Sequence, residues 1–152
     1  MMTLISKSNQ ETKNIAAKLA KYLRARDCVA LCGDLGSGKT TFVKGLARGL
    51  DIKETQVISP SFMLIRQYKG KLPLYHFDLY RLDYLEQVEY LGYEEYFYGD
   101  GVCCIEWAEK IEELLPVEHL EIDIKSLSEY KRKITFKSTS NRYNNIIGKL
   151  KK

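Results

Sequence analysis

Two stretches of the chain consist mainly of consecutive apolar residues: "CVALC" at 28–32 and "GVCCIEW" at 101–107. Apolar runs of this length predict strands that are buried on both faces. Each run is followed by apolar residues at helical spacing, over 40–50 after the first run and over 108–115, which Pro116 ends, after the second. The pattern therefore predicts a buried strand followed by a helix at two places.

Two pairs of shorter segments predict β-hairpins. "FMLIRQY" at 62–68 and "KLPLYHFDLY" at 71–80 lie on either side of a "KGK" turn. "LEIDIKSL" at 120–127 and "KRKITFKS" at 131–138 alternate apolar and polar residues. This alternation predicts an antiparallel hairpin at the edge of a sheet, with one face buried.

The remaining patterned segments predict one strand and two helices. "TLIS" at 3–6 is a short strand, and "SNQE" at 8–11 is a capping box ahead of apolar residues at helical spacing over 15–23. "YLEQVEYLGYEEYF" at 84–97 is helical in pattern but is interrupted by Gly92.

The loop after the first buried strand matches a phosphate-binding motif. Gly33 to Thr40 fit G-x-x-x-x-G-K-[ST] at every fixed position. Glycines let several backbone N–H groups converge on phosphate oxygens, and the N-terminus of the following helix adds partial positive charge. Lys39 then reaches the β- and γ-phosphates, and the Thr40 hydroxyl binds Mg²⁺. The alternative is a glycine-rich turn without a ligand.

The nucleotide is predicted to be ATP, bound with Mg²⁺. The D-x-x-G and N-K-x-D motifs that GTPase switches usually carry do not occur in the sequence. No motif spells out adenine recognition either, so ATP follows by elimination. The residues predicted to surround its phosphates are Gly33, Asp34, Leu35, Gly36, Ser37, Gly38, Lys39, Thr40 and Thr41.

Two carboxylates come at the ends of predicted strands. Asp78 ends "LPLYHF" and Glu106 ends "VCCI". In an open α/β sheet the carboxyl ends of the strands form the binding edge, so both are expected to face the phosphate loop. Asp78 is predicted to hold Mg²⁺ through water, and Glu106 to polarise the attacking water or also to support the metal. The alternatives are a helix cap or a salt bridge to Arg81 for Asp78, and a solvated strand end for Glu106.

Three further residues are candidates for the same site. The Ser61 hydroxyl is predicted to lie near the γ-phosphate, with a plain turn as the alternative. Trp107, the single tryptophan, follows Glu106, and on a strand its side chain would point the opposite way. Core packing and stacking at the edge of the site both remain open for it. His76 alternates with Asp78, so it either lines the site or is a structural histidine.

Composition places the chain among ordinary globular domains. Its 152 residues predict one domain, and no apolar run approaches the about 20 residues that cross a bilayer. The N-terminus lacks the apolar region of a signal peptide, so a cytoplasmic location without membrane contact is expected. The four cysteines lack zinc-finger spacing and are expected to be buried, reduced thiols rather than disulfide or metal ligands.

Charge and aromatic residues point to contacts with other molecules. Much of the net charge of +4 lies in "KSTSNRYNNIIGKLKK" at the C-terminus. We expect this end to be solvated, with an RNA contact as the alternative. Tyrosines interleaved with glutamates over 75–98 favour a partner surface, although core packing accounts for some of them.

At four motifs the sequence resembles a known family. "GDLGSGKTTFVKGLARGL", "SPSF", "YHFDLYRL" and "CIEWAEKI" occur in the order and at the separations of the TsaE (YjeE) family, the small bacterial P-loop ATPases of tRNA threonylcarbamoyladenosine (t6A) synthesis. The resemblance extends from about residue 8 to about residue 125. One departure is Ser61, where the family usually has threonine; the hydroxyl is retained. The division that follows is a P-loop ATPase domain over 1–138 and a basic C-terminal tail over 139–152.

The resemblance implies an α/β fold, a single-domain P-loop NTPase with a mixed sheet whose parallel core is flanked by antiparallel strands, with helices on both faces. It implies slow ATP hydrolysis by the protein alone and action on the complex of two partners, TsaD and TsaB. It also implies Mg²⁺ at Thr40, chemistry and metal support at Asp78 and Glu106, catalytic participation of Lys39, and Trp107 beside the nucleotide. A weak or indirect tRNA contact is the remaining partner expectation.

Two other functions are compatible with a phosphate loop. A small P-loop kinase would transfer phosphate to an acceptor other than water, but such kinases usually need an arginine-rich lid, and the arginines here are scattered. A non-hydrolysing module would bind ATP in order to dock a partner. Both remain alternatives to the ATPase.

Overall fold

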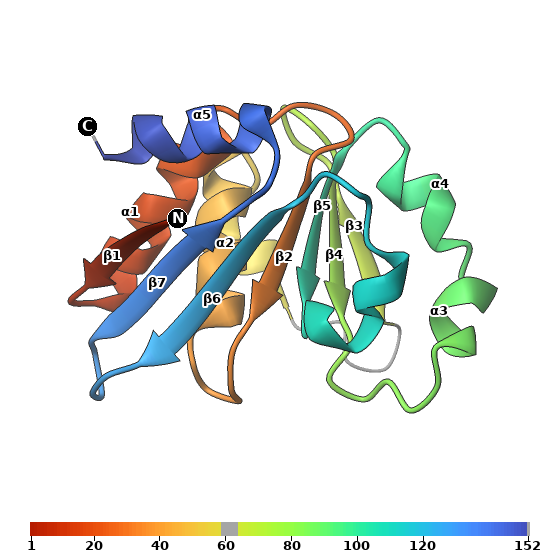
Figure 1. The fold of residues 1–152 in the computed structure, drawn as a ribbon, viewed down its shortest axis with the longest axis horizontal. Helices are drawn as coiled ribbons and strands as arrows, with labels where there is room; N and C mark the ends of the chain where they lie inside the picture. Colours follow the sequence, from red (N-terminus) through yellow and green to blue (C-terminus); the bar gives the residue numbers. More distant parts are fainter. Residues whose placement is uncertain (59–63, 152) are drawn as a thin grey trace.

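The structure of the protein is a computed structural model that describes residues 1–58 and 64–151. Its centre is a seven-stranded sheet in the order β1-β7-β6-β2-β5-β4-β3 (Figure 1). The strands are β1 Met2–Ser6, β2 Cys28–Cys32, β3 Ile65–Tyr68, β4 Leu74–Asp78, β5 Val102–Glu106, β6 Leu120–Ser126 and β7 Arg132–Lys137. The helices are α1 Asn9–Ala20, α2 Lys39–Gly49, α3 Glu86–Tyr90, α4 Tyr93–Phe97 and α5 Asn141–Leu150, with the 3-10 helices η1 Glu54–Gln56 and η2 Ala108–Leu114.

The sheet is mixed. β2 is parallel to both of its neighbours, β5 and β6, and β5 is parallel to β4. The pairs β3–β4, β6–β7 and β1–β7 are antiparallel. This arrangement confirms the predicted α/β class with a parallel core flanked by antiparallel strands. Because parallel strands need long crossovers, the helices between them come to lie on the faces of the sheet.

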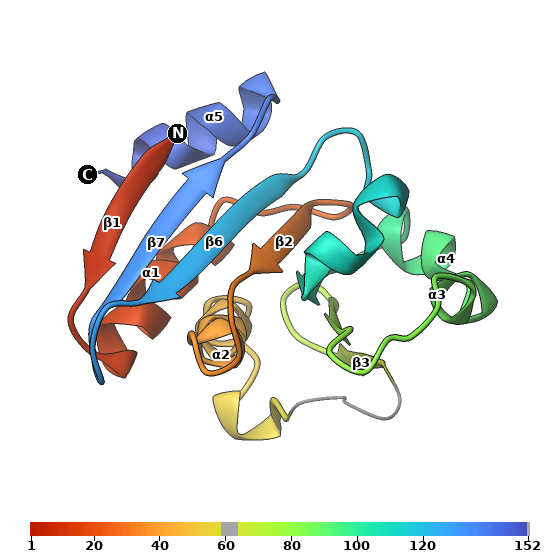
Figure 2. The ribbon, with the colours of Figure 1, turned by 60° about the horizontal axis from the view of Figure 1, so that its bottom comes forward.

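Side chains of the central strands alternate between two cores. Val29 and Leu31 of β2 contribute to a core with α1 and α2, while Cys28 and Ala30 contribute to one with α4 and η2. Figures 1 and 2 show α1 and α2 on one side of the strands and η2 on the other. Both faces of the parallel core are therefore buried, which explains the unbroken apolar run at 28–32.

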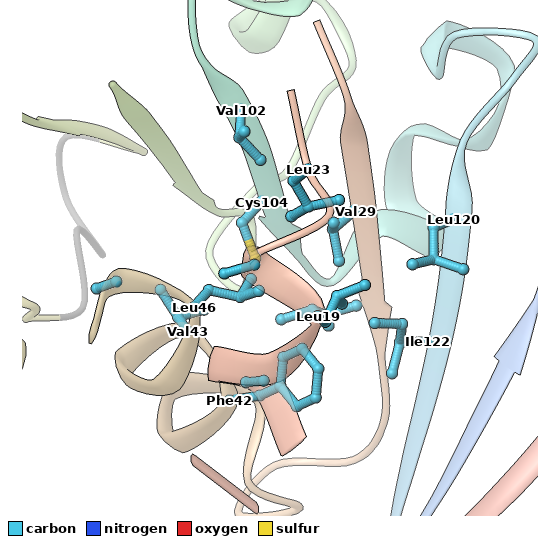
Figure 3. Packing of buried hydrophobic residues seen from close by; sticks show 14 of the residues in the cluster. Leu19, Leu23, Val29, Phe42, Val43, Leu46, Val102, Cys104, Leu120 and Ile122 are labelled. Carbon is cyan, nitrogen blue, oxygen red and sulfur yellow. The ribbon is translucent and has the colours of Figure 1, made fainter. Parts of the chain in front are cut away.

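Helices α1 and α2 approach each other closely against the sheet. Phe42, Val43 and Leu46 of α2 surround Leu19 of α1 beneath the central strands (Figure 3). Gly45 lies at the contact: a Cβ atom there would be 2.4 Å from the carbonyl oxygen of Lys13 and 2.7 Å from the Cβ atom of Ala16. A glycine is therefore needed at 45 for steric reasons, although it weakens an isolated helix.

We expect Gly45→Ala to lower the free energy of unfolding by about 1–3 kcal/mol, because overpacking exceeds the gain in helix propensity. Urea unfolding followed by circular dichroism measures this change. Gly148→Ala in α5 is the matched control, since a Cβ atom there would have no described atom within 4 Å apart from its chain neighbours and the backbone of its own helix. The control should be neutral or stabilising by up to about 1 kcal/mol. Equal stability of the two variants would contradict the assigned helix contact.

The structure corrects the prediction that 120–127 and 131–138 form a hairpin at the sheet edge. The hairpin exists as β6 and β7 with the predicted alternation of buried residues, but β1 pairs with the outer side of β7. Leu4 lies opposite Ile134 in this pair. The position of β1 depends on a contact between the two ends of the chain, which local patterns do not reveal.

The expectation of a solvated C-terminal end is also wrong for residues 141–150. They form α5, whose buried residues Tyr143, Ile146, Ile147 and Leu150 follow helical spacing and join the core of α1 and α2. Ser140 caps the helix by accepting a hydrogen bond from the backbone N–H of Tyr143. Arg142 forms an ion pair with Asp27, whose carboxylate also accepts a hydrogen bond from the Tyr143 hydroxyl.

Three of the four cysteines are buried, as the sequence predicted. Cys28, Cys103 and Cys104 are buried, Cys32 is half-buried, and none of them is in a disulfide within the described residues. Burial raises the pKa of the Cys28 and Cys32 thiols to about 12. These thiols are therefore protonated and unreactive at neutral pH. Across residues 1–58 and 64–151, no helix has the length and apolar character that a membrane crossing requires.

Candidate functional site

The phosphate-loop sequence forms an open turn between β2 and α2. Gly33, Gly36 and Gly38 have φ values of 148°, 78° and 109°, a region that side chains disfavour. A Cβ atom on Gly33 would also lie 2.4 Å from the backbone oxygen of Ile124. Gly38 precedes the first residue of α2, and no described side chain caps that end of the helix. The first N–H groups of α2 are therefore available to an anion.

Lys39 is held inside the loop that it follows. Its Nζ atom donates hydrogen bonds to the carbonyl oxygens of Gly33 at 2.6 Å and Asp34 at 2.9 Å. The same atom lies 4.0 Å from the centre of the Trp107 ring. Burial lowers the pKa of the Lys39 ammonium, while Glu106 and other nearby carboxylates oppose this shift. A largely buried cation is thus fixed beside the loop.

Glu106, at the end of β5, contacts side chains from two other elements. One oxygen of its carboxylate, Oε1, accepts a hydrogen bond of 2.9 Å from the Thr40 hydroxyl at the start of α2. The other, Oε2, lies 2.6 Å from Nε2 of His76 on β4. The carboxylate and the imidazole are both buried. Two partners therefore fix the orientation of Glu106, and His76 is a positioning residue for it.

Asp78 lies next to Glu106 in the parallel sheet. The two are register partners at the carboxyl ends of β4 and β5, and both are buried. Oδ1 of Asp78 accepts a hydrogen bond of 3.1 Å from the backbone N–H of Tyr80. Asp78 and Glu106 therefore lie together, as predicted from their positions at strand ends, and both line one cavity with the phosphate loop.

The structure decides between the two positions that the sequence left open for Trp107, core packing and the edge of the site. A strand that continued through Trp107 would point its side chain away from Glu106, but β5 ends at Glu106 and Trp107 has a left-handed backbone with φ of 62°. Its ring contacts the ring of Tyr80, with 5.3 Å between the centres, and the ammonium of Lys39. Because the turn redirects the side chain, Trp107 and Glu106 line the same cavity.

A cavity of about 410 Å³ lies between the loop and the strand ends. This volume is within the usual range for small-molecule sites. The predicted residues that line it are Leu35, Gly36, Gly38, Lys39, Thr40, Thr41, Asp78, Glu106 and Trp107. Gly33 and Asp34 instead present their carbonyls to Lys39. The buried Ser37 hydroxyl has no hydrogen-bond partner among the described residues. Ser61 lies outside the described residues.

The oxygen atoms of this cavity suit a hard cation. Thr40 and Glu106 bring a hydroxyl and a carboxylate into contact, and Asp78 adds a second carboxylate. In the part of the chain that the structure describes, no three His, Cys, Asp or Glu side chains form a metal-binding group. Mg²⁺ usually binds through one or two carboxylates together with water and phosphate oxygens. The donor set therefore fits Mg²⁺ carried by a nucleotide.

Comparisons with known proteins agree with the fold and with the motifs. The family model "Threonylcarbamoyl adenosine biosynthesis protein TsaE" matches residues 6–134. The chain belongs to the TsaE family. The tRNA threonylcarbamoyladenosine biosynthesis protein TsaE of Bacillus subtilis is 48% identical over 143 residues, 93% of this chain and 88% of that protein. The protein of the same name from Treponema pallidum is 42% identical over 134 residues, 88% of this chain and 98% of that protein.

A solved structure of the same shape is also known. The crystal structure of Bacillus subtilis YdiB matches this TsaE-family chain with a TM-score of 0.82 and 42% identity, covering 99% of this chain and 93% of that one. The fold is therefore shared by a protein whose structure was determined by experiment.

Four residues that line the cavity of this TsaE-family chain were not among the predicted site residues. They are Asn9, Tyr80, Arg81 and Arg132. One signal for Arg132 exists in the sequence: it precedes Ile134 and Phe136 at a spacing of two, so it occupies a position on the buried face of β7. A charged residue at such a position is a candidate for a site rather than for the core.

Proposed function

We propose that this chain binds and hydrolyses ATP and that this activity serves the synthesis of t6A in tRNA. The observation that carries the proposal is the contact between Thr40 and Glu106, because it places a carboxylate beside the hydroxyl that the phosphate-loop motif reserves for Mg²⁺. The names of the Bacillus and Treponema relatives support the biological role.

The roles we assign follow the positions of the side chains. The amides from Gly33 to Thr41 cradle the phosphates. Lys39 gives up its hydrogen bonds to the loop carbonyls and donates instead to oxygens of the β- and γ-phosphates. Thr40 and Glu106 would hold Mg²⁺, with Asp78 supporting it through water. The metal would neutralise the charge that develops on the transferred phosphoryl group.

A water molecule must attack the γ-phosphate in line with the leaving oxygen. Glu106 and Asp78 are the two carboxylates at this end of the cavity, and either is able to orient that water. His76 holds Glu106 in one orientation, so the carboxylate need not reorganise when the substrate binds. Trp107 and Tyr80, whose rings are in contact, line the same cavity and would limit the access of bulk water to a bound nucleotide.

Partner proteins are part of the proposal. TsaD and TsaB are the partners that the family resemblance implies, and we infer that they stimulate the ATPase. The exposed tyrosines Tyr80, Tyr84, Tyr90 and Tyr98 support a docking surface near α3 and α4, whereas Tyr75 is buried in the core. A weak or indirect tRNA contact remains part of the same proposal.

We expect Mg-ADP to change the fluorescence of Trp107, because binding displaces Lys39 from the indole ring. Titration of this change gives the dissociation constant of Mg-ADP.

Phosphate release measures ATP turnover with and without TsaD and TsaB. A complete mixture that hydrolyses no more ATP than buffer would exclude the ATPase and leave the docking module. Phosphate transfer to a small acceptor in place of water would favour the kinase. Deletion of the gene, followed by mass spectrometry of bulk tRNA for the modified adenosine, tests the biological role.

A further inference from the structure

The side chain of Arg132 lies next to the phosphate loop, although Arg132 is distant from this loop in the sequence. It is the first residue of β7, just after the turn that joins β6 to β7, and Figure 1 shows this turn at the same edge of the sheet as the loop after β2. The side chain lines the cavity together with Gly38 and Thr41. The hairpin therefore supplies a guanidinium to the site.

One end of this guanidinium is fixed by the turn itself. The Nη1 atom of Arg132 donates hydrogen bonds to the carbonyl oxygens of Ser128 at 2.8 Å, Glu129 at 3.2 Å and Lys131 at 2.9 Å. Nη1 carries two N–H groups, so one of them is shared between two of these carbonyls, and together the contacts hold the planar group in a single orientation. The binding geometry is thus set before a ligand arrives, which lowers the entropic cost of binding.

The opposite edge of the guanidinium has an unsatisfied donor. Nε of Arg132 is buried and has no hydrogen-bond partner among the residues that the structure describes. A Cβ atom on Gly38 would lie 3.4 Å from this Nε. A buried N–H group without an acceptor is costly, so its position over the phosphate loop indicates that a ligand atom is its partner.

The order of strands in the sheet determines which part of the nucleotide Arg132 can contact. β5 and β4, which carry Glu106 and Asp78, lie on one side of β2, while β6 and β7 lie on the other. In a phosphate loop, the lysine and the metal serve the β- and γ-phosphates, and the remaining amides extend to the α-phosphate. Because Arg132 lies across the loop from the carboxylates, it faces the α-phosphate end.

We propose that Arg132 binds the α-phosphate of the nucleotide from the side opposite Glu106. This inference rests on the proposed nucleotide binding and adds a binding residue from the β6–β7 hairpin. The bond is charge-assisted, and it is the same in ATP and ADP because both carry the α-phosphate. The side chain is therefore a binding residue that contributes equally before and after hydrolysis.

Isothermal titration with Mg-ADP and with the non-hydrolysable analogue Mg-AMP-PNP tests the proposal. Arg132→Ala should weaken both ligands by the same factor, about tenfold to a hundredfold. Arg132→Lys keeps the charge without the planar fork and should lose less. Lys133→Ala is the matched control, since it removes an exposed positive charge from the next residue of the same strand. It should change either affinity by less than about twofold.

Other outcomes identify what has failed. Wild-type affinity in Arg132→Ala would overturn the proposal and reduce Arg132 to a support of its own turn. If Arg132→Ala loses more affinity for AMP-PNP than for ADP, the side chain contacts the γ-phosphate. If it loses affinity for ADP but not for GDP, the side chain contacts the base. Either result overturns the α-phosphate contact. Wild-type protein that binds neither ligand would instead refute the proposed function. If Arg132→Ala does not fold, Arg132→Lys decides, because unchanged affinity there contradicts the need for a planar fork.

Discussion

Glu106→Gln is expected to lower ATP turnover by about a hundredfold or more, while ADP affinity stays within a few fold of the wild type. Glutamine keeps the shape of the side chain and an oxygen for the hydrogen bond from the Thr40 hydroxyl, but it removes the negative charge. Both proposed roles of Glu106, orienting water and supporting the metal, need that charge. Single-turnover hydrolysis at saturating Mg-ATP in the presence of TsaD and TsaB measures the effect.

The control for this variant is Glu113→Gln, which removes an exposed carboxylate from η2 and should leave turnover unchanged. Titrating ADP with and without Mg²⁺ separates the two roles. If Glu106 supports the metal, Mg²⁺ strengthens ADP binding less in Glu106→Gln than in the wild type; if it only orients water, the gain is the same. A loss of ADP affinity as large as that of Lys39→Ala would show that Glu106 is a binding residue instead.

Lys39→Ala is expected to weaken Mg-ATP binding by about a hundredfold, and Mg-ADP binding by less, because the ammonium is proposed to reach the γ-phosphate as well as the β-phosphate. Equilibrium titration with AMP-PNP and ADP measures the two losses. This ligand-dependent pattern differs from the equal losses expected for Arg132→Ala.

Folding of the Lys39 variant needs its own measurement. The Lys39 ammonium donates to the carbonyl oxygens of Gly33 and Asp34, so its removal leaves these oxygens to water. We expect the free energy of unfolding to change by less than about 1 kcal/mol, since the loop is open to solvent. Lys69→Ala, in the exposed turn between β3 and β4, is the charge control and should bind both nucleotides normally. Equal losses for ATP and ADP in Lys39→Ala would argue against contact with the γ-phosphate.

The sequence predicted the parts of the site that depend on local chemistry. The phosphate loop is contiguous, and its glycines are needed where the backbone has positive φ, so the motif and the conformation agree. Asp78 and Glu106 were found because each follows an apolar run and strand ends share one edge of a parallel sheet. The buried strands β2 and β5 of the parallel core were predicted because each contains an unbroken run of apolar residues.

The parts that the sequence missed depend on contacts between distant segments. Arg132 enters the cavity only because β6 and β7 continue the sheet beside β2, and no local pattern states that order. The pattern left two positions open for Trp107, because only the structure shows that a left-handed residue ends the alternation that a strand would impose. Helix α5 was missed for another reason. The basic charge of the segment was given more weight than the helical spacing of its apolar residues from Tyr143 to Leu150, which are the residues that become buried.

The pairing of β1 with β7 has a consequence for synthesis. The strand at 2–6 leaves the ribosome before five other strands of the sheet and before the strand that it pairs with, at 132–137. Closing so long a loop carries a large entropic cost and slows folding. During synthesis β1 therefore remains unpaired until β7 has been made, and an unpaired strand of this kind is a segment that a chaperone would protect from aggregation.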